Sequence, residues 1–119
     1  GLQRKVNTLA KSLTLADRKR LEVAKALATD PKLLLLDEVL AGLNPTEVEE
    51  AVDMIKDINK SGISILMIEH VLQATMAICN HIVVLDYGKK IAEGTPQEVT
   101  NNPEVIKAYL GDEYEAVIN

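Results

Sequence analysis

The chain has 119 residues, 47% of them apolar and 26% charged, with a formal net charge of −5. This composition predicts a globular protein with one modest core and excludes an intrinsically disordered chain. The acidic balance argues against a general nucleic-acid binder, and the single Cys79 excludes an internal disulfide. No apolar run approaches the roughly 20 residues of a membrane span.

The first clear element is an amphipathic helix that follows Thr14. Thr14 can cap this helix with Asp17 at its third position, residues 18–20 are expected to form a solvated face, and Pro31 ends the pattern. Residues 33–37, which read LLLLD, are predicted to form a strand. Because the apolar run does not alternate, we expect this strand to be covered on both faces, as in a parallel sheet.

The second half of the chain continues the alternation of helices and strands. Asn44-Pro45-Thr46-Glu47 is typical of a capped helix start, and that helix is expected to reach about Lys60 before Gly62. Further strands are predicted at residues 63–68, 82–86 and 90–93, the last as the returning arm of a hairpin. A short helix to about residue 78, capped helix starts at residues 95 and 102, and a loose tail complete the prediction.

Four polar residues follow the first two predicted strands: Asp37, Glu38, Glu69 and His70. Ligands of parallel sheets bind beyond the carboxyl ends of the strands, so we expect these residues to share one edge. Asp37 could hold a hydrated Mg²⁺, and Glu38, on the other side of an extended chain, could orient or deprotonate a water that attacks a phosphate. The alternative is that Asp37 and Glu38 form a polar strand exit or cap the following turn.

Several segments resemble the ATP-binding cassette (ABC) ATPases in order and spacing. The segment LLLLDE (33–38) resembles the Walker B strand, AGLN (41–44) the D-loop, and MIEH (67–70) the switch-histidine segment. The segment LTLAD (13–17) occupies the place of the signature LSGGQ. Downstream, YGKKIAEGTPQEV and NNPEVIKAYLG closely resemble the C-terminal region of subunits that energise branched-chain amino acid uptake.

The resemblance implies an α/β fold with a partial, three-layer, P-loop NTPase-like parallel sheet, a short antiparallel hairpin and C-terminal helices. It implies a signature helix at the end of a helical subdomain in residues 1–30, the C-terminal part of the ATPase core in residues 31–111, and a loose tail in residues 112–119. The implied activity is ATP hydrolysis coupled to transport of branched-chain amino acids or similar solutes.

The resemblance also implies roles for single residues, with ATP and Mg²⁺ as cofactors. Asp37 matches the Mg²⁺-associated aspartate, Glu38 the catalytic base, and His70 the histidine that contacts the γ-phosphate. The signature positions would clasp ATP held by a second ATPase subunit and are Leu13, Thr14, Leu15, Ala16 and Asp17. The D-loop positions would lie across the dimer interface and are Ala41, Gly42, Leu43 and Asn44.

The chain departs from the family pattern at several of these positions. Thr14 keeps the hydroxyl of the signature serine, whereas Ala16 replaces a glycine and Asp17 a glutamine. An acidic residue near a triphosphate is unfavourable unless it turns back to cap its own helix. Val39 stands where a proline usually follows the glutamate, and Asn44 replaces an aspartate and has either a capping role alone or an interface contact as well.

No two glycines have the spacing of a P-loop, G-x-x-x-x-G-K-[ST], and no Q-loop is visible. We therefore expect the chain to be the C-terminal half of a larger subunit that neither binds ATP tightly nor hydrolyses it alone. Exposed sheet edge and apolar surface would then favour self-association. The resemblance implies a peripheral, cytoplasmic location on the inner face of the membrane, docked on membrane-embedded permease subunits.

Two other functions fit the pattern less well. A phospho-accepting receiver-like signalling domain would also have an Asp at a strand exit, but it needs an acidic pair after its first strand and a suitably placed lysine. A non-catalytic subunit of a membrane complex, with a decayed site, is supported only by Asp17, Val39 and Asn44. His81 and Cys79 are expected to be packing or surface residues rather than ligands.

Overall fold

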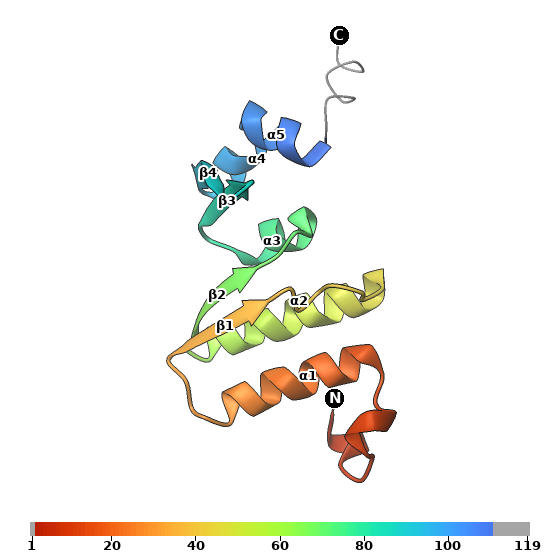
Figure 1. Cartoon of the computed structure of the whole chain (residues 1–119). Helices are drawn as coiled ribbons and strands as arrows, with labels where there is room; N and C mark the ends of the chain where they lie inside the picture. Colours follow the sequence, from red (N-terminus) through yellow and green to blue (C-terminus); the bar gives the residue numbers. More distant parts are fainter. Residues whose placement is uncertain (1, 111–119) are drawn as a thin grey trace. The chain divides into compact units, whose positions relative to one another are not determined.

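The computed structural model describes residues 2–110, which fall into two compact units that divide between Ile78 and Cys79 (Figure 1). The first unit holds the helices and the parallel strands that carry the candidate site. The second holds a hairpin and two helices. The boundaries expected at residues 30 and 111 remain a prediction, and the tail at 112–119 lies outside the described residues.

The first unit opens with two short 3₁₀ helices, Leu2–Lys5 and Ala10–Ser12, followed by helix α1 at Leu15–Leu27. The hydroxyl oxygen of Thr14 accepts a hydrogen bond from the backbone N–H of Asp17 at 3.2 Å, so the predicted cap is confirmed.

Two strands of the first unit pair in parallel. Strand β1, Leu33–Asp37, runs beside β2, Ser64–Ile68, in a register that sets Leu33 opposite Ser64 and Asp37 opposite Ile68. Helix α2, Pro45–Lys60, connects the strands, and α3, Leu72–Ile78, follows β2. The capping box predicted at the start of α2 is confirmed, because the Asn44 and Glu47 side chains each accept from the other's backbone N–H at 3.0 Å.

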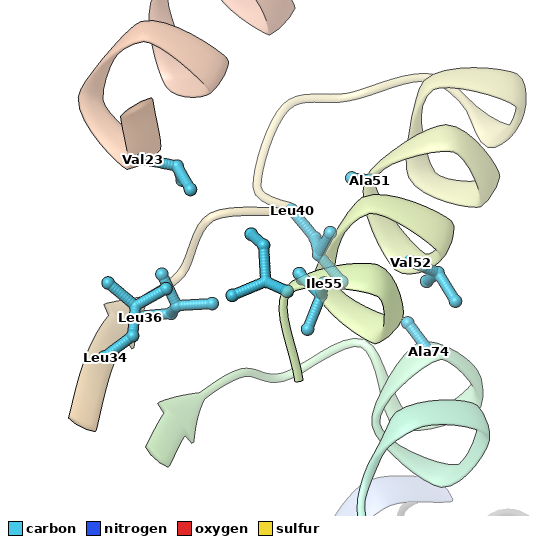
Figure 2. Packing of buried hydrophobic residues seen from close by; sticks show 9 residues of the cluster. Val23, Leu34, Leu36, Leu40, Ala51, Val52, Ile55 and Ala74 are labelled. Carbon is cyan, nitrogen blue, oxygen red and sulfur yellow. The ribbon is translucent and has the colours of Figure 1, made fainter. Parts of the chain in front are cut away.

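One face of β1 supplies the core of the first unit. Leu34 and Leu36 point into a cluster with Val23 of α1 and Ile55 of α2, beside Leu40 from the turn after β1 (Figure 2). Leu40 is 1% exposed and Ile55 is fully buried. Burying a side chain of this size stabilises a fold by about 1.5–3 kcal/mol, so this cluster fixes β1 against both helices.

The opposite face of the β1–β2 sheet is open within the described residues. Leu35 is 65% exposed and Leu66, its partner in the register, is 61% exposed. The expectation that β1 is covered on both faces is therefore wrong for this part of the chain. The physical reason is that α1 and α2 both pack against Leu34 and Leu36, which leaves no described element for the other side. We call this surface the leucine face, and it consists of Leu33, Leu35, Leu66 and Ile68.

The second unit contains strand β3, Ile82–Asp86, antiparallel to β4, Lys89–Gly94. Tyr87 and Gly88 both have positive φ, 44° and 77°, as the tight two-residue hairpin turn requires. Within the described residues β3 pairs only with β4, so it forms a separate sheet and does not extend the parallel one.

Two helices complete the second unit, α4 at Pro96–Thr100 and α5 at Pro103–Leu110. The predicted capping box of α4 is confirmed, because the Thr95 hydroxyl accepts from the Glu98 N–H and the Glu98 carboxylate accepts from the Thr95 N–H. Val99 and Val105, each 1% exposed, join Ile82 and Val84 among the buried residues of this unit. Among residues 2–110, no helix is both long enough and apolar enough to cross a bilayer.

Candidate functional site

The parallel register brings the four predicted polar residues to one edge of the sheet. Asp37 lies opposite Ile68, so Glu38 and Glu69 begin the two segments that leave the sheet there. The Glu38 N–H donates to the Ile68 carbonyl at 2.9 Å, and Nδ1 of His70 lies 3.4 Å from a Glu38 carboxylate oxygen. We call these residues, Asp37, Glu38, Glu69 and His70, the rim. The structure thus places the acidic pair and the imidazole together as expected, while their chemical roles remain predictions.

The backbone of Glu38 is not extended, which corrects one expectation. Its φ is 48°, in the left-handed region that residues other than Gly, Asn and Asp adopt rarely, at a cost on the order of 1–3 kcal/mol. The carbonyl of Glu38 accepts from Nζ of Lys19 at 2.9 Å and from the N–H of Ala41 at 3.2 Å. Hydrogen bonds on both sides of the residue therefore hold the turn that aims its carboxylate.

The carboxylate of Asp37 is exposed, and no side chain among residues 2–110 bonds to it. Strand alternation places it on the same side of the sheet as the leucine face. In the described part of the chain no three His, Cys, Asp or Glu side chains gather as a metal site. Mg²⁺ can nevertheless be held by a single protein carboxylate when phosphate oxygens and water supply its other ligands. The free carboxylate of Asp37 therefore fits that ion.

Glu69 is the least exposed carboxylate of the rim. Its Oε1 accepts a hydrogen bond from the N–H of Leu40 at 2.8 Å, and its Oε2 is buried with no donor among the described residues. Glu69 was predicted at this edge from the sequence, but no role was assigned to it. Its length and its position one residue before His70 let it cross to the turn after β1.

The D-loop positions lie between the rim and α2. Gly42 has φ 75°, and a Cβ added there would lie 3.0 Å from a methyl carbon of Leu15. The D-loop segment therefore lies directly against the signature segment of the same chain at this point. Asn44 forms the cap of α2, and Ala41 and Leu43 complete the turn through backbone bonds to Glu38 and Leu40.

At the signature positions, the substituted acidic residue is paired. Leu13, Ala16 and Asp17 are buried, while Thr14 and Leu15 are exposed. The Asp17 carboxylate accepts from the Lys5 ammonium and from the Thr14 hydroxyl at 2.9 Å, and lies 3.5 Å from the Arg20 guanidinium. The hydrogen bond from Lys5, followed by that from Thr14, holds the pKa of Asp17 below its ordinary value of 3.8. The carboxylate is thus turned back toward its own helix, as the spacing allows.

The contacts of three residues in this region, Lys5, Lys19 and Glu69, were not predicted from the sequence. Residues 18–20 were expected to form only a solvated face, which is wrong for Lys19 and Arg20. Arg20 bonds to Asp17 and to Glu50 of α2, and Lys19 to Glu38. The spacing of Arg20 three residues after Asp17 was a usable signal, whereas the contacts of Lys5 and Lys19 cross 12 and 19 residues and follow no local pattern.

Comparison with known proteins finds relatives that cover most of this chain. Residues 89–115 match the family model described as "Branched-chain amino acid ATP-binding cassette transporter". The chain is 43% identical, over 113 residues, to the high-affinity branched-chain amino acid transport ATP-binding protein LivG of Salmonella typhimurium. That match covers 94% of this chain and 44% of LivG.

The chain is of the ABC transporter ATP-binding type. BraF of Pseudomonas aeruginosa, another ATP-binding protein of high-affinity branched-chain amino acid transport, is 41% identical over 89% of the chain and 42% of BraF. The lipopolysaccharide export system ATP-binding protein LptB of Haemophilus influenzae is 36% identical over 91% of the chain and 45% of LptB. The chain therefore spans a little under half the length of these curated relatives.

Solved ABC structures share the fold. MJ1267, an ATP-binding cassette of an ABC transporter, superimposes with a TM-score of 0.79 at 30% identity, over 87% of this chain and 43% of MJ1267. CbiO1 of Clostridium perfringens, part of the ABC transporter complex cbiONQ, gives a TM-score of 0.72 at 32% identity, over 92% of this chain and 44% of that chain. The partial ABC ATPase fold expected from the sequence, with its parallel strands, hairpin and C-terminal helices, is confirmed.

The pairing of Asp17 makes a prediction about pH. The pKa of Asp17 is lower in the folded chain than in the unfolded chain, so its ionised carboxylate stabilises the fold at pH values above the unfolded pKa. This stabilisation is lost as the pH falls through the lower pKa of the folded chain. We expect Lys5→Met to lower the stability of α1 at pH 7, and the difference from wild type to shrink as pH falls below about 3.8. Thermal unfolding followed by circular dichroism at several pH values measures this difference. Lys11→Met, at an exposed lysine, is the control, and a loss for Lys5→Met that persists unchanged at low pH contradicts the pairing.

Proposed function

We propose that the chain supplies the signature, Walker B, D-loop and switch-histidine segments of an ATPase that drives uptake of branched-chain amino acids. The observation that carries the proposal is the rim, where an exposed Asp37 stands next to Glu38 and Glu38 meets His70 across two parallel strands. The similarity to LivG and BraF, and the family match at residues 89–115, support the branched-chain class. These relatives give no support to a receiver-like domain.

Asp37 would hold Mg²⁺, which supplies a positive charge against the phosphate oxygens of ATP. Glu38 would accept a hydrogen bond from a water and take its proton as the water attacks the terminal phosphate. Its left-handed backbone, held by Lys19 and Ile68, keeps that carboxylate at the rim. Positioning and electrostatics are the main means by which proteins catalyse phosphoryl transfer.

His70 would contact the γ-phosphate from β2. Its Nδ1 lies 3.4 Å from a Glu38 carboxylate oxygen, so the two side chains face each other at the rim. This contact would orient the imidazole beside the phosphate.

The signature residues would act on ATP held by a second ATPase subunit. The first N–H groups of α1 and the helix dipole attract phosphate. The negative charge of Asp17 would oppose this attraction, but Lys5 and Arg20 offset it. The Asp17 carboxylate also accepts a hydrogen bond from the Thr14 hydroxyl. The segment Ala41–Asn44 would lie across the interface between the subunits. We also propose that the assembly docks on membrane-embedded permease subunits from the cytoplasmic side.

The proposed function is tested in a subunit that joins this chain to a P-loop segment taken from a longer relative such as LivG. We expect Glu38→Gln to reduce the ATP hydrolysis rate by at least about 100-fold, the scale of a lost general base, with ATP binding retained. Steady-state hydrolysis and fluorescent-nucleotide binding measure the two effects. Glu49→Gln, at an exposed site on α2, is the matched control.

Three results contradict the proposal. The first is a Glu38→Gln subunit that hydrolyses ATP as fast as the wild type, and the second is a folded wild-type subunit without hydrolysis. The third is robust turnover by the chain without a P-loop, since the rim would then have no cradle for the triphosphate.

The leucine face predicts the behaviour of the chain without a P-loop segment. Four large aliphatic side chains more than half exposed on one sheet face favour association with a second copy, which removes apolar area from water. We expect a mass that rises with concentration in light scattering, and a shift toward monomer for the double variant Leu35→Lys, Leu66→Lys. Val6→Lys, which replaces an exposed apolar residue elsewhere, is the control. A wild-type chain that stays monomeric at millimolar concentration rules out this association.

A further inference from the structure

We propose that Glu69 is a positioning residue that couples the switch-histidine segment to the turn carrying Glu38 and the D-loop. The inference rests on the proposed function, because it assigns Glu69 to the same ATPase site. Glu69 lies outside the residues to which the family resemblance gave a role. Its assignment comes from the contacts of three successive residues at the end of β2.

The three successive residues each reach the turn after β1. The Ile68 carbonyl accepts from the Glu38 N–H at 2.9 Å, Glu69 Oε1 accepts from the Leu40 N–H at 2.8 Å, and His70 Nδ1 lies 3.4 Å from Glu38 Oε1. The first involves Glu38, one residue beyond the last paired position of β1. The other two continue the connection beyond the strands by means of side chains. Glu69 therefore extends the pairing into segments that would otherwise be free to separate.

The Glu69 contact is the more protected of the two side-chain contacts. Glu38 and His70 have side chains 55% and 63% exposed, so their attraction is weakened by water. Glu69 is partly buried, and its bond ends on the backbone of Leu40, a residue that is 1% exposed and anchored in the core. A hydrogen bond to a fixed main-chain N–H sets direction as well as distance, so Glu69 can transmit a shift of the turn.

Stability alone does not account for a carboxylate at this position. Oε2 is buried and no group among residues 2–110 donates to it, so the contact is made in spite of a desolvation cost. No lysine, arginine or histidine of the described chain forms an ion pair with Glu69. What the residue does provide is one acceptor for Leu40. Displacing Leu40 and the D-loop behind it would move Glu69, and with it the adjacent His70.

The experiment compares Glu69→Ala, Glu69→Gln and the control Glu49→Ala in the subunit joined to a P-loop segment. We expect Glu69→Ala to lower kcat at least about tenfold with KM for ATP changed less than about twofold, since an interaction that aligns the reacting groups is lost. Glutamine keeps the acceptor without the charge, so Glu69→Gln is expected to retain most of the wild-type kcat. Glu49→Ala should match wild type.

A second readout uses the chain itself. Hydrogen exchange of the Leu40 amide should be at least about tenfold faster in Glu69→Ala than in wild type, and the His70 ring resonances should shift, while Glu69→Gln leaves both near wild type. This readout does not depend on ATP hydrolysis. A folded wild-type subunit without hydrolysis would therefore defeat the proposed function, while the amide and ring signals still test the coupling.

Three results would overturn the inference. Glu69→Ala with the kcat of the control shows that the contact does not position the site. Glu69→Gln as impaired as Glu69→Ala shows that the charge, and not the acceptor, is used. Leu40 exchange unchanged in a folded Glu69→Ala chain shows that the hydrogen bond does not hold the turn.

Discussion

The parallel pairing of β1 with β2 determines where every candidate catalytic group lies. Two strands that run in the same direction end at the same edge of the sheet, and here their last residues, Asp37 and Ile68, are paired. The acidic pair and the imidazole, more than 30 positions apart in sequence, meet there for that reason. A register shift of one residue would reverse the faces of Leu34 and Leu36 and remove the core that holds β1.

The rim is held by contacts that converge on the strained turn at Glu38. A left-handed glutamate persists only if its surroundings over-determine its conformation. Here α1 contributes Lys19, β2 contributes the carbonyl of Ile68, and the buried Leu40 anchors the following residues. Leu15 against Gly42 links the signature segment to the same turn. The segments that would act on nucleotide in the two subunits of a dimer are thus joined mechanically within one chain.

The sequence predicted the local structure well and the long-range contacts poorly. The caps at Thr14, Asn44 and Thr95 depend on residues three apart, and the common edge of the two strands follows from topology alone, so both could be predicted. The left-handed Glu38 and the reach of Lys5, Lys19 and Glu69 could not, because each depends on how separate elements pack. The unbroken apolar strand predicts two covers without showing which segment supplies the second, so an exposed apolar surface was expected but its residues were not.

The most direct test is paramagnetic relaxation by Mn²⁺ bound with ATP to the subunit in which this chain is joined to a P-loop segment. If the rim receives the nucleotide, the signals of Asp37, Glu38 and His70 broaden most. Asp30, which precedes β1 at the other end of a five-residue strand, lies roughly 15–20 Å farther away and broadens much less. Stronger broadening at Asp30 than at Asp37, or equal broadening at both, would contradict the placement of the catalytic groups.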